Sequence, residues 1–312
     1  MAALCQRGCA VRAAGRQTHA PGILGDVEWV VVGEVGPETN WRAALDGVEV
    51  VFHLAALAHQ LGVRDGSRAV EFDTVNHFGT RRLAEVALVT PGVRRIVFLS
   101  SVAAVSSFAD RPVDLRTIPS PVDDYGRSKH AAEVALADVL SDGPLDWCTL
   151  RPPLVYGPGN PGNMGRLQRL VKTGLPLPFG ALHNRRSFVY VGSLVDALLT
   201  CASHPAASRR TFFVTDGEVL STPELARRIA EGRGVRSRLV SVPLAWLRLA
   251  ASAGDAVNRI LGRSVGIDTY ALDRLAGSLE VDGSEIERVL DWRRPYTGAE
   301  GLIRTLESPV GE

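Results

Sequence analysis

The stretch Tyr125-Gly-Arg-Ser-Lys129 follows the pair Ser100-Ser101, which ends the apolar run Arg95-Ile-Val-Phe-Leu99. The apolar run predicts a buried strand, and the spacing of Tyr125 and Lys129 is one helical turn. Residues i and i+4 share a helix face, so we expect the Lys129 ammonium to stand beside the Tyr125 phenol and to lower its pKa from about 10. A serine hydroxyl, a phenol and an ammonium form a proton-transfer set for moving hydride to or from a carbonyl.

Around this stretch, apolar runs alternate with helical patterns, which predicts an α/β fold with a parallel sheet covered on both faces. The expected strands are Ala10–Ala14, Val27–Val32, Glu49–Leu54, Arg95–Leu99, Trp147–Leu150 and Thr211–Val214. The expected helices span residues 40–46, 73–90, 124–140, 163–173, 193–203, 222–232, 243–262 and 298–307. The helix near 222 has a start signal in Ser221-Thr-Pro-Glu224, a hydroxyl cap with an acid three residues on.

The chain has 312 residues, of which 46% are hydrophobic, and its formal net charge is +1. That composition allows one large or two modest domains, and it indicates neither a nucleic-acid surface nor an acidic tail. No apolar run is long enough for a membrane span, and the N-terminus lacks the apolar segment of a signal peptide. The cysteines have no zinc-binding spacing, so we expect reduced thiols in a cytoplasmic protein at Cys5, Cys9, Cys148 and Cys201.

Two further features are assigned to the folded structure rather than to a ligand or a membrane. His53 and His59 have no carboxylate or cysteine partner at ligand spacing, so we expect hydrogen-bonded or surface histidines and no metal site. The apolar segment Val242–Ala251 lacks a basic polar face, which favours a helix of the folded domain over one lying on a membrane surface.

A set of motifs, in order along the chain, resembles the extended short-chain dehydrogenase/reductases, the NAD(P)-dependent epimerases, dehydratases and reductases of nucleotide sugars. The motifs are Val51-Phe-His-Leu-Ala-Ala56, Asn76-His-Phe-Gly-Thr80, Phe98-Leu-Ser-Ser101, Tyr125-Gly-Arg-Ser-Lys129, Leu150-Arg-Pro-Pro-Leu-Val-Tyr-Gly-Pro-Gly159 and Arg186-Ser-Phe-Val-Tyr-Val191. The resemblance runs from about residue 3 to the C-terminus. The stretches 174–191 and 278–292 look most like a subgroup that reduces UDP-4-keto-6-deoxy-N-acetylhexosamines for surface polysaccharide.

This resemblance implies a Rossmann-like, doubly wound parallel sheet that binds NAD(P), together with a smaller α/β domain that binds the substrate. The cofactor domain would span residues 1–155 and 186–216, and the substrate domain residues 156–185 and 217–312. The active site would lie in the cleft at the carboxyl ends of the strands. The same resemblance implies a homodimer formed through a four-helix bundle that includes the helix carrying Tyr125.

The resemblance also assigns roles to individual residues. Ser101 would orient the C4 oxygen of a UDP-sugar, Tyr125 would be the acid and base, and Lys129 would tune Tyr125 and bind the nicotinamide ribose. Further cofactor contacts would come from Leu54, Ala55, Ala56, Asn76, Pro152 and Pro153. Asn163 and Arg186 match positions that hold the substrate diphosphate; a guanidinium fork suits phosphate, whereas Asn163 equally suits a helix N-cap.

One part of the family pattern is absent from the sequence. The first strand and its GxxGxxG loop are missing, and residues 3–16 read as the end of a first helix followed by the second strand. That loop presents backbone N–H groups and a helix N-terminus to the cofactor pyrophosphate. We therefore expect residues 1–312 to fold poorly or to bind the cofactor weakly, through a start site assigned too late or a true truncation.

The residues expected near the adenosine end of the cofactor differ from the pattern for NAD. An acid at the end of the second strand would bind the ribose 2′-hydroxyl of NAD, whereas this chain has Gly15-Arg16 there. An arginine at that place favours the 2′-phosphate, so NADP(H) is expected in preference to NAD(H). Glu34 occupies the adenine-side position at which the family usually has an aspartate.

Several activities share these residues. The leading hypothesis is reduction of a UDP-4-keto-6-deoxy-N-acetylhexosamine at C4, and a UDP-hexose 4-epimerase with retained NAD is the alternative. Val102-Ala103 stands where dehydratases carry an Asp-Glu pair, which argues against dehydration. A non-catalytic dinucleotide sensor or scaffold would account for the missing loop, and a steroid-type reductase would need a more apolar pocket.

Overall fold

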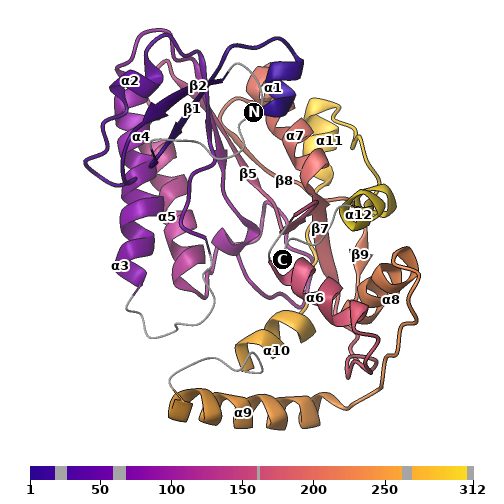
Figure 1. Cartoon of the computed structure of the whole chain (residues 1–312). Helices are drawn as coiled ribbons and strands as arrows, with labels where there is room; N and C mark the ends of the chain where they lie inside the picture. The colour runs from indigo at the N-terminus through magenta and orange to yellow at the C-terminus, as the bar shows by residue number, and fades with distance from the viewer. Residues whose placement is uncertain (18–26, 59–67, 160–161, 262–268, 308–312) are drawn as a thin grey trace.

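The computed structural model describes residues 1–17, 27–58, 68–159, 162–261 and 269–307 (Figure 1). Its largest sheet is parallel, with the strand order β3 (Val50–His53), β4 (Arg95–Leu99), β5 (Asp146–Arg151) and β8 (Arg210–Phe213). A separate parallel pair joins β1 (Val11–Gly15) to β2 (Val27–Val31). All of these strands lie within one residue of the predicted bounds, because buried parallel strands have continuous apolar sequences.

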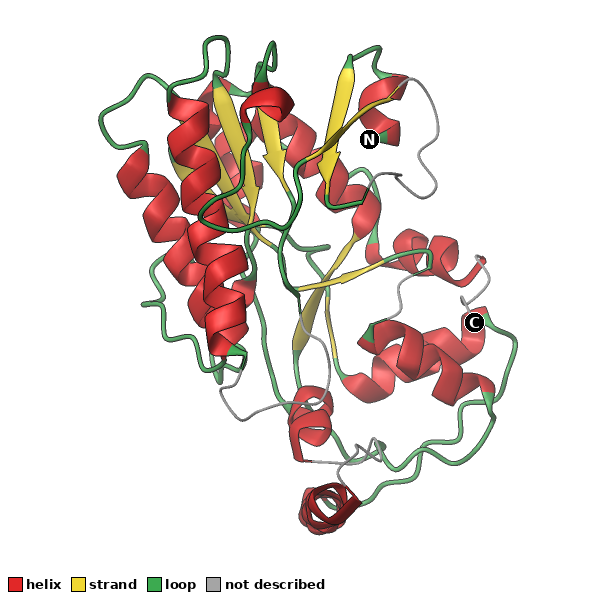
Figure 2. Ribbon diagram, turned by 60° about the vertical axis from the view of Figure 1, so that its left-hand side comes forward, coloured by secondary structure: helices red, strands yellow, loops and turns green. Residues whose placement is uncertain are grey.

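Helices cover both faces of the four-stranded sheet (Figures 1 and 2). One layer contains α2 (Arg42–Leu45), α4 (Gly79–Leu88) and α5 (Asp124–Val139). The other layer contains α7 (Val191–Ser203) and α11 (Ser284–Leu290).

Strand β4 shows why its sequence is apolar without interruption. Ile96 and Phe98 belong to the core on the α4 and α5 side, whereas Val97 belongs to the core on the α7 and α11 side. All three side chains are completely buried. Because alternate residues of a strand face opposite sides of the sheet, a sheet covered on both faces requires apolar residues at every position.

A second region surrounds a small sheet of β6 (Leu154–Tyr156), β7 (Arg186–Tyr190) and β9 (Val219–Leu220). Its core is completed by α6 (Asn163–Lys172), α8 (Thr222–Gly232) and α12 (Gly298–Glu307). Helices α9 (Leu244–Leu261) and α10 (Thr269–Ala276) lie at the lower end of the molecule in both views (Figures 1 and 2). The division into a cofactor domain and a substrate domain at the predicted boundaries stays a prediction.

The remaining elements are short. They are α1 (Ala2–Gln6), α3 (Ala69–Phe72), the π-helical segment η1 (Asp73–Phe78) and the 3₁₀ segments η2 (Val102–Ala104) and η3 (Pro205–Ala207). The helix predicted over residues 73–90 is therefore η1 followed by α4. The start signal predicted for α8 is confirmed as a capping box, in which the Ser221 N–H donates to Glu224 Oε2 at 2.7 Å.

Several elements were not predicted from the sequence, namely β6, β7, β9, α3, α10 and α11. Strands as short as β6 and β9 give no periodic signal, and they form because β7 lies between them as a partner on each side. Helices α10 and α11 are likewise too short for their apolar spacing to stand out from the surrounding sequence.

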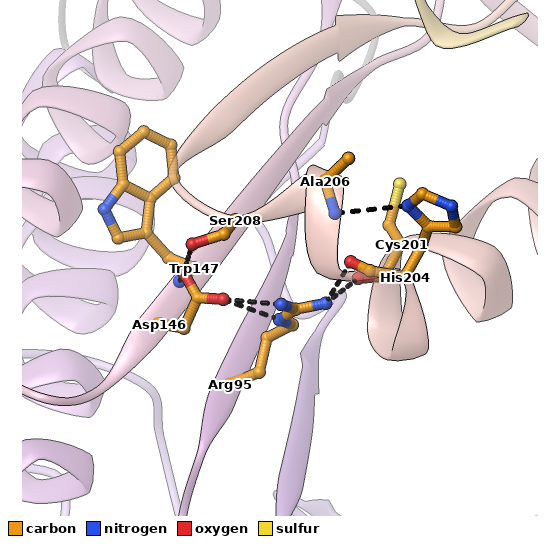
Figure 3. A network of polar contacts seen from close by, with 7 residues as sticks. All are labelled: Arg95, Asp146, Trp147, Cys201, His204, Ala206 and Ser208. Atoms are coloured by element: carbon orange, nitrogen blue, oxygen red, sulfur yellow. Dashed lines mark hydrogen bonds and ion pairs between the residues drawn. The ribbon is translucent and has the colours of Figure 1, made fainter. Parts of the chain in front are cut away.

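A partly buried ion pair connects the amino-terminal ends of the central strands to helix α7 (Figure 3). The Arg95 guanidinium donates to Asp146 Oδ2 at 3.0 and 2.6 Å, and to the carbonyl oxygens of Cys201 and His204 at 2.8 and 2.9 Å. Asp146 in turn accepts from the Ser208 hydroxyl at 2.8 Å. Arg95 therefore binds two of the carbonyl groups that the end of α7 leaves without helical partners.

The pair β1–β2 is separate from the larger sheet. Within the described ranges, neither β1 nor β2 forms a strand pairing with β3, β4, β5 or β8. β3 consequently has one side of its backbone outside the strand pairing, and Val50, Val51 and Phe52 are only partly buried. No helix in the described part of the chain combines the length and apolar character needed to span a bilayer.

Candidate active site

A glycine brings the start of helix α5 onto the segment that follows strand β4. The Ser101 hydroxyl accepts from the Ala103 N–H at 3.1 Å, and the Asp123 side chain caps α5 by accepting from the Gly126 N–H at 2.7 Å. A Cβ atom on Gly126 would lie 2.3 Å from the Ala103 carbonyl oxygen, so a larger residue would force the two segments apart. Tyr125, in the first turn of α5, thereby forms a hydrogen bond with the Ser101 side chain.

Burial has the largest influence on the acid–base chemistry of Tyr125. Burial raises the pKa of the phenol above its usual value, the hydrogen bond with Ser101 lowers it, the Asp123 charge raises it and the Arg274 charge lowers it. The phenol is thus held in its protonated form, next to a hydroxyl that can share a substrate oxygen. That arrangement suits donation of a proton to a carbonyl oxygen.

Lys129 is buried on the same helix, with 2% of its surface exposed. Its Nζ donates to the Leu99 carbonyl oxygen at 2.7 Å and lies 4.6 Å from the centroid of the Phe98 ring. Burial lowers the pKa of this ammonium to about 7, and the Glu133 charge raises it. The expectation that Lys129 lowers the pKa of Tyr125 stays a prediction; burial has the larger, opposite influence on the phenol, and the ammonium is hydrogen-bonded to the strand backbone.

Asn76 joins the loop after β3 to helix α5. Its Oδ1 accepts from the Leu57 N–H at 2.7 Å, and its Nδ2 donates to the Leu57 carbonyl at 3.0 Å and to Ser128 Oγ at 2.9 Å. Ser128 then donates to the Tyr125 carbonyl oxygen at 2.9 Å. Asn76 lies in η1, and such π-helical turns occur often at functional sites. These bonds connect Asn76 to the loop after β3 and to the helix that carries Tyr125, and its predicted contact with the cofactor stays a prediction.

His53 is a hydrogen-bonded core residue, as expected. Its Nε2 lies 2.8 Å from Thr80 Oγ1, and its ring stacks on Phe98 with centroids 5.4 Å apart. Burial, followed by the charge of Lys129, lowers the pKa of His53 to about 3, so this ring is neutral. His59 lies outside the described residues. Among the residues that the structure describes, no group of three or more His, Cys, Asp and Glu side chains is arranged to hold a metal ion.

The predicted contacts at the adenosine end lie at the carboxyl ends of β1 and β2. The Arg16 guanidinium is 3.3 Å from the Glu34 carboxylate, and both side chains are largely exposed. Arg16 and Glu34 thus form an ion pair. A free Glu34 carboxylate would repel a ribose 2′-phosphate and could accept a hydrogen bond from a ribose hydroxyl. Leu54 and Ala55 are exposed after the end of β3, with Ala56 partly buried, where their backbone can border a ligand.

The predicted residues after β5 are less open. Pro152 and Pro153 are buried, and the Pro152 carbonyl oxygen accepts from the Val102 N–H at 2.9 Å. This bond fixes the proline segment against the segment that carries Ser101. Asn163 is the first residue of α6, and its side chain is outside what the structure describes.

Two arginines lie on the substrate side of Tyr125. Arg186, at the start of β7, donates to the carbonyl oxygens of Arg274 and Gly277 at 2.9 and 3.0 Å. Burial and the charge of Arg274 lower the pKa of Arg186 to about 10. The Arg274 guanidinium lies 3.8 Å from the Asp123 carboxylate, next to the start of the helix that carries Tyr125. The neighbouring Arg185 instead pairs with Glu280.

Arg274 was missed by the sequence analysis. It belongs to α10, which was not predicted, and it follows Arg186 by 88 residues along the chain. The sequence around a single arginine does not indicate which distant residues will lie next to it in the folded protein. Only the packing of α10 beside β7 brings this second guanidinium close to Tyr125.

The residues present fit one end of a dinucleotide cofactor. Ser101, Tyr125 and the buried ammonium of Lys129 lie together at the carboxyl ends of β4 and β5, which is where doubly wound sheets bind such ligands. The exposed segment after β3 borders the same edge. Over the described residues, however, no glycine-rich turn joins a strand to a helix to receive the pyrophosphate.

Comparisons with known proteins agree with this geometry. Residues 1–214 match the model of the NAD dependent epimerase/dehydratase family. A UDP-glucose 4-epimerase of Vibrio cholerae is 34% identical over 280 residues, which cover 89% of this chain and 81% of the relative. The N-acetyl-alpha-D-glucosaminyl-diphospho-ditrans,octacis-undecaprenol 4-epimerase of Escherichia coli O157:H7 is 26% identical over 88% of this chain and 82% of its own.

Solved structures give the same result. MoeE5, in complex with UDP-glucose and NAD, superimposes with a TM-score of 0.74 at 26% identity, covering 98% of this chain and 92% of that protein. These similarities confirm the Rossmann-like fold and the NAD-dependent, nucleotide-sugar character of the group, whereas they do not support the expected preference for NADP(H). The chain belongs to the NAD dependent epimerase/dehydratase family.

Proposed function

We propose that this protein is a UDP-sugar 4-epimerase that uses NAD and transfers the proton of the C4 hydroxyl group through Tyr125. The observation that carries the proposal is the hydrogen bond between Tyr125 and Ser101 at the carboxyl end of β4. The Vibrio cholerae relative, which is named a UDP-glucose 4-epimerase, supports epimerisation in preference to the reduction expected from the sequence.

In this proposal the chain positions the sugar and moves its proton. The Ser101 hydroxyl and the Tyr125 side chain share the C4 oxygen. Tyr125 would accept the hydroxyl proton in its phenolate form, which the positive charge of a bound, oxidised nicotinamide would favour over the phenol. NAD, when bound, supplies the hydride acceptor and returns the hydride. The 4-keto sugar then rotates in the site so that its opposite face receives the hydride. Tyr125 returns the proton to the oxygen, which gives the opposite configuration at C4. Lys129 would hold the cofactor ribose with its buried ammonium.

The diphosphate of the substrate is assigned to the two arginines. Arg186 and Arg274 are close enough for the charge of one to lower the pKa of the other, and an anion between them would relieve that repulsion. Guanidinium groups bind phosphate oxygens through paired hydrogen bonds. Asn163, at the start of α6, is kept as a further diphosphate contact. Pro152, Pro153 and the segment Leu54–Ala56 would border the nicotinamide and the adjoining ribose.

A second candidate is the one-way reduction of a UDP-4-keto-6-deoxy-N-acetylhexosamine, which needs the same proton donor. The resemblance of the stretches 174–191 and 278–292 to that subgroup favours it. One pair of assays separates the two reactions. An epimerase interconverts UDP-glucose and UDP-galactose, or their N-acetyl analogues, with catalytic NAD and no net change in absorbance at 340 nm. A reductase consumes NADH or NADPH stoichiometrically with the 4-keto substrate and leaves the UDP-hexoses unchanged, and that result would replace the proposal.

The assembly and location are also proposals. The outer faces of α4 and α5 lie side by side, and Val134 on α5 is 46% exposed, which supports a homodimer through these helices. Sedimentation of the wild type and of Val134→Glu tests it, since a charge in an apolar interface would shift a dimer toward monomer. A cytoplasmic location is supported by the free thiols of Cys148 and Cys201, which are buried beside each other without forming a disulfide.

A further inference from the structure

Helix α9 carries two apolar stripes, and only one of them is covered. Leu244, Leu247 and Ala251 recur at helical spacing and are partly or fully buried, on the side that packs against α10 and the adjoining core. Trp246 and Leu249 begin the second stripe, which continues through small apolar residues to Val257. Trp246 is 65% exposed, Leu249 62% and Val257 41%. Figures 1 and 2 show α9 at the edge of the molecule, away from the central sheet.

The charge around this stripe has one sign. Between Gly234 and Gly254 the sequence contains Arg236, Arg238 and Arg248 and no Asp or Glu. All three arginines are exposed, and within the described residues none of them forms an ion pair. Val240, 47% exposed, lies in the segment just before the helix. The backbone of that segment is fixed to the body of the protein, because the Val240 N–H donates to the Leu177 carbonyl at 2.9 Å.

We infer that the exposed stripe of α9, which includes Trp246 and Leu249, docks on an anionic lipid bilayer together with Val240, Arg236 and Arg238 of the segment before the helix. An indole and aliphatic side chains at the acyl boundary, with arginines at the level of the headgroups, are the features of a helix that lies in a membrane interface. A second copy of the chain is a poorer occupant, because a two-fold contact would bring the basic segments of both copies, each with Arg236 and Arg238, to the same interface. The apolar segment Val242–Ala251 has no basic face of its own, but Arg236 and Arg238 lie in the loop just before it.

The position of α9 gives the docking a consequence for the site. Helix α10, which packs against α9, carries Arg274, and Arg274 lies 3.8 Å from Asp123 at the start of the Tyr125 helix. The candidate active site is therefore one helix away from the docking surface. A protein held in this way would present its sugar site close to lipid headgroups while its cofactor-side helices face the aqueous phase.

Vesicle flotation with the full chain tests the inference, and it needs neither substrate nor cofactor. The wild type is expected to float with vesicles of phosphatidylglycerol and phosphatidylcholine, less with phosphatidylcholine alone, and less as the salt concentration rises. The double variant Trp246→Gln/Leu249→Gln should bind about tenfold more weakly or worse, because both side chains lose their apolar burial. Arg236→Glu/Arg238→Glu should lose the preference for anionic vesicles.

The matched control is Val89→Gln/Ile118→Gln, which removes two apolar side chains that are 77% and 85% exposed elsewhere. It should float as well as the wild type, and circular dichroism confirms that each variant is folded. Equal binding by the α9 variants and the control would overturn the inference. A failure of the wild type to float with any vesicles would also overturn the inference. In that case, loss of self-association in Trp246→Gln/Leu249→Gln would identify the surface as a contact between copies of the chain. Because the assay involves no sugar chemistry, its failure would leave the proposed epimerase activity untouched.

Discussion

Gly126 lies so close to Ala103 that a Cβ atom on the glycine would be 2.3 Å from the Ala103 carbonyl oxygen. The atom that this Cβ would meet belongs to the backbone, so no flexible side chain can move aside to relieve the clash. It sets the distance between the segment that carries Ser101 and the helix that carries Tyr125. The geometry of the proton-transfer pair thus depends on a residue that has no chemistry of its own.

Substituting Gly126→Ala should damage both stability and activity. Overpacking at a rigid contact typically costs about 1–3 kcal/mol, and any shift that relieves it separates Tyr125 from Ser101. Urea unfolding and the epimerisation rate measure the two effects. Gly36→Ala is the control for stability, because its Cβ would meet its nearest atom at an ordinary 3.5 Å. Equal stability of the two variants would show that the contact at Gly126 is looser than described.

Asn76→Ala should release the loop that follows β3. The substitution leaves the Leu57 N–H and carbonyl without their side-chain partner, at a cost of about 1–3 kcal/mol. Hydrogen exchange at the Leu57 amide should accelerate, which a general loss of stability alone would not confine to this loop. Thr74→Ala removes a single hydroxyl on the same helical segment and serves as the control. Unchanged exchange at Leu57 would contradict the assigned role of Asn76.

Lys129 should make stability depend on pH in the neutral to alkaline range. Burial lowers its pKa from 10.5 to about 7 in the folded state, so the unfolded chain binds more protons between these values. The free energy of unfolding of the wild type, relative to Lys129→Met, should therefore rise with pH from about 7 to 10, by up to about 1.4 kcal/mol per unit. Below pH 7 the difference should be constant. Urea unfolding of both proteins from pH 6 to 10 measures this, and a flat difference throughout would show that Lys129 keeps its usual pKa.

Arg95→Met should destabilise the fold far more than the same change at its neighbour. Arg95 and Asp146 form a partly buried pair, with side chains 12% and 19% exposed, and leaving one of these charges without its partner should cost up to about 3–5 kcal/mol. Arg94 pairs with Glu49 on the surface, where the two side chains are 70% and 67% exposed. Arg94→Met should change stability by less than about 1 kcal/mol. Similar thermal unfolding of both variants would contradict the importance of the network in Figure 3.

The central strands and the longer helices were predictable because their signals are local. Residues 96–99 are apolar at every position, and the spacing of Tyr125 and Lys129 identifies a helix face. Sheet β6–β7–β9 was not predictable, because residues far apart in sequence pair over only a few positions. Arg274 was missed for the same reason.

The electrostatic environment was the least predictable part of the site. Sequence places Lys129 next to Tyr125 on the helix, but it does not show that the ammonium bonds to Leu99 or that burial raises the Tyr125 pKa. The pairing of Arg16 with Glu34 was equally hidden, although both were selected as cofactor contacts. Solvent exposure and the direction of long side chains depend on tertiary packing, which no local pattern records.

The most direct test of the central claim compares two tyrosine variants in the interconversion of UDP-glucose and UDP-galactose with NAD present. The wild type should interconvert the sugars, Tyr125→Phe should lose at least about a hundredfold of the rate because the proton donor is gone, and Tyr296→Phe should retain it. Thermal unfolding verifies that both variants are folded. Full activity in Tyr125→Phe, or no interconversion by the wild type of either these sugars or their N-acetyl analogues, would contradict the account.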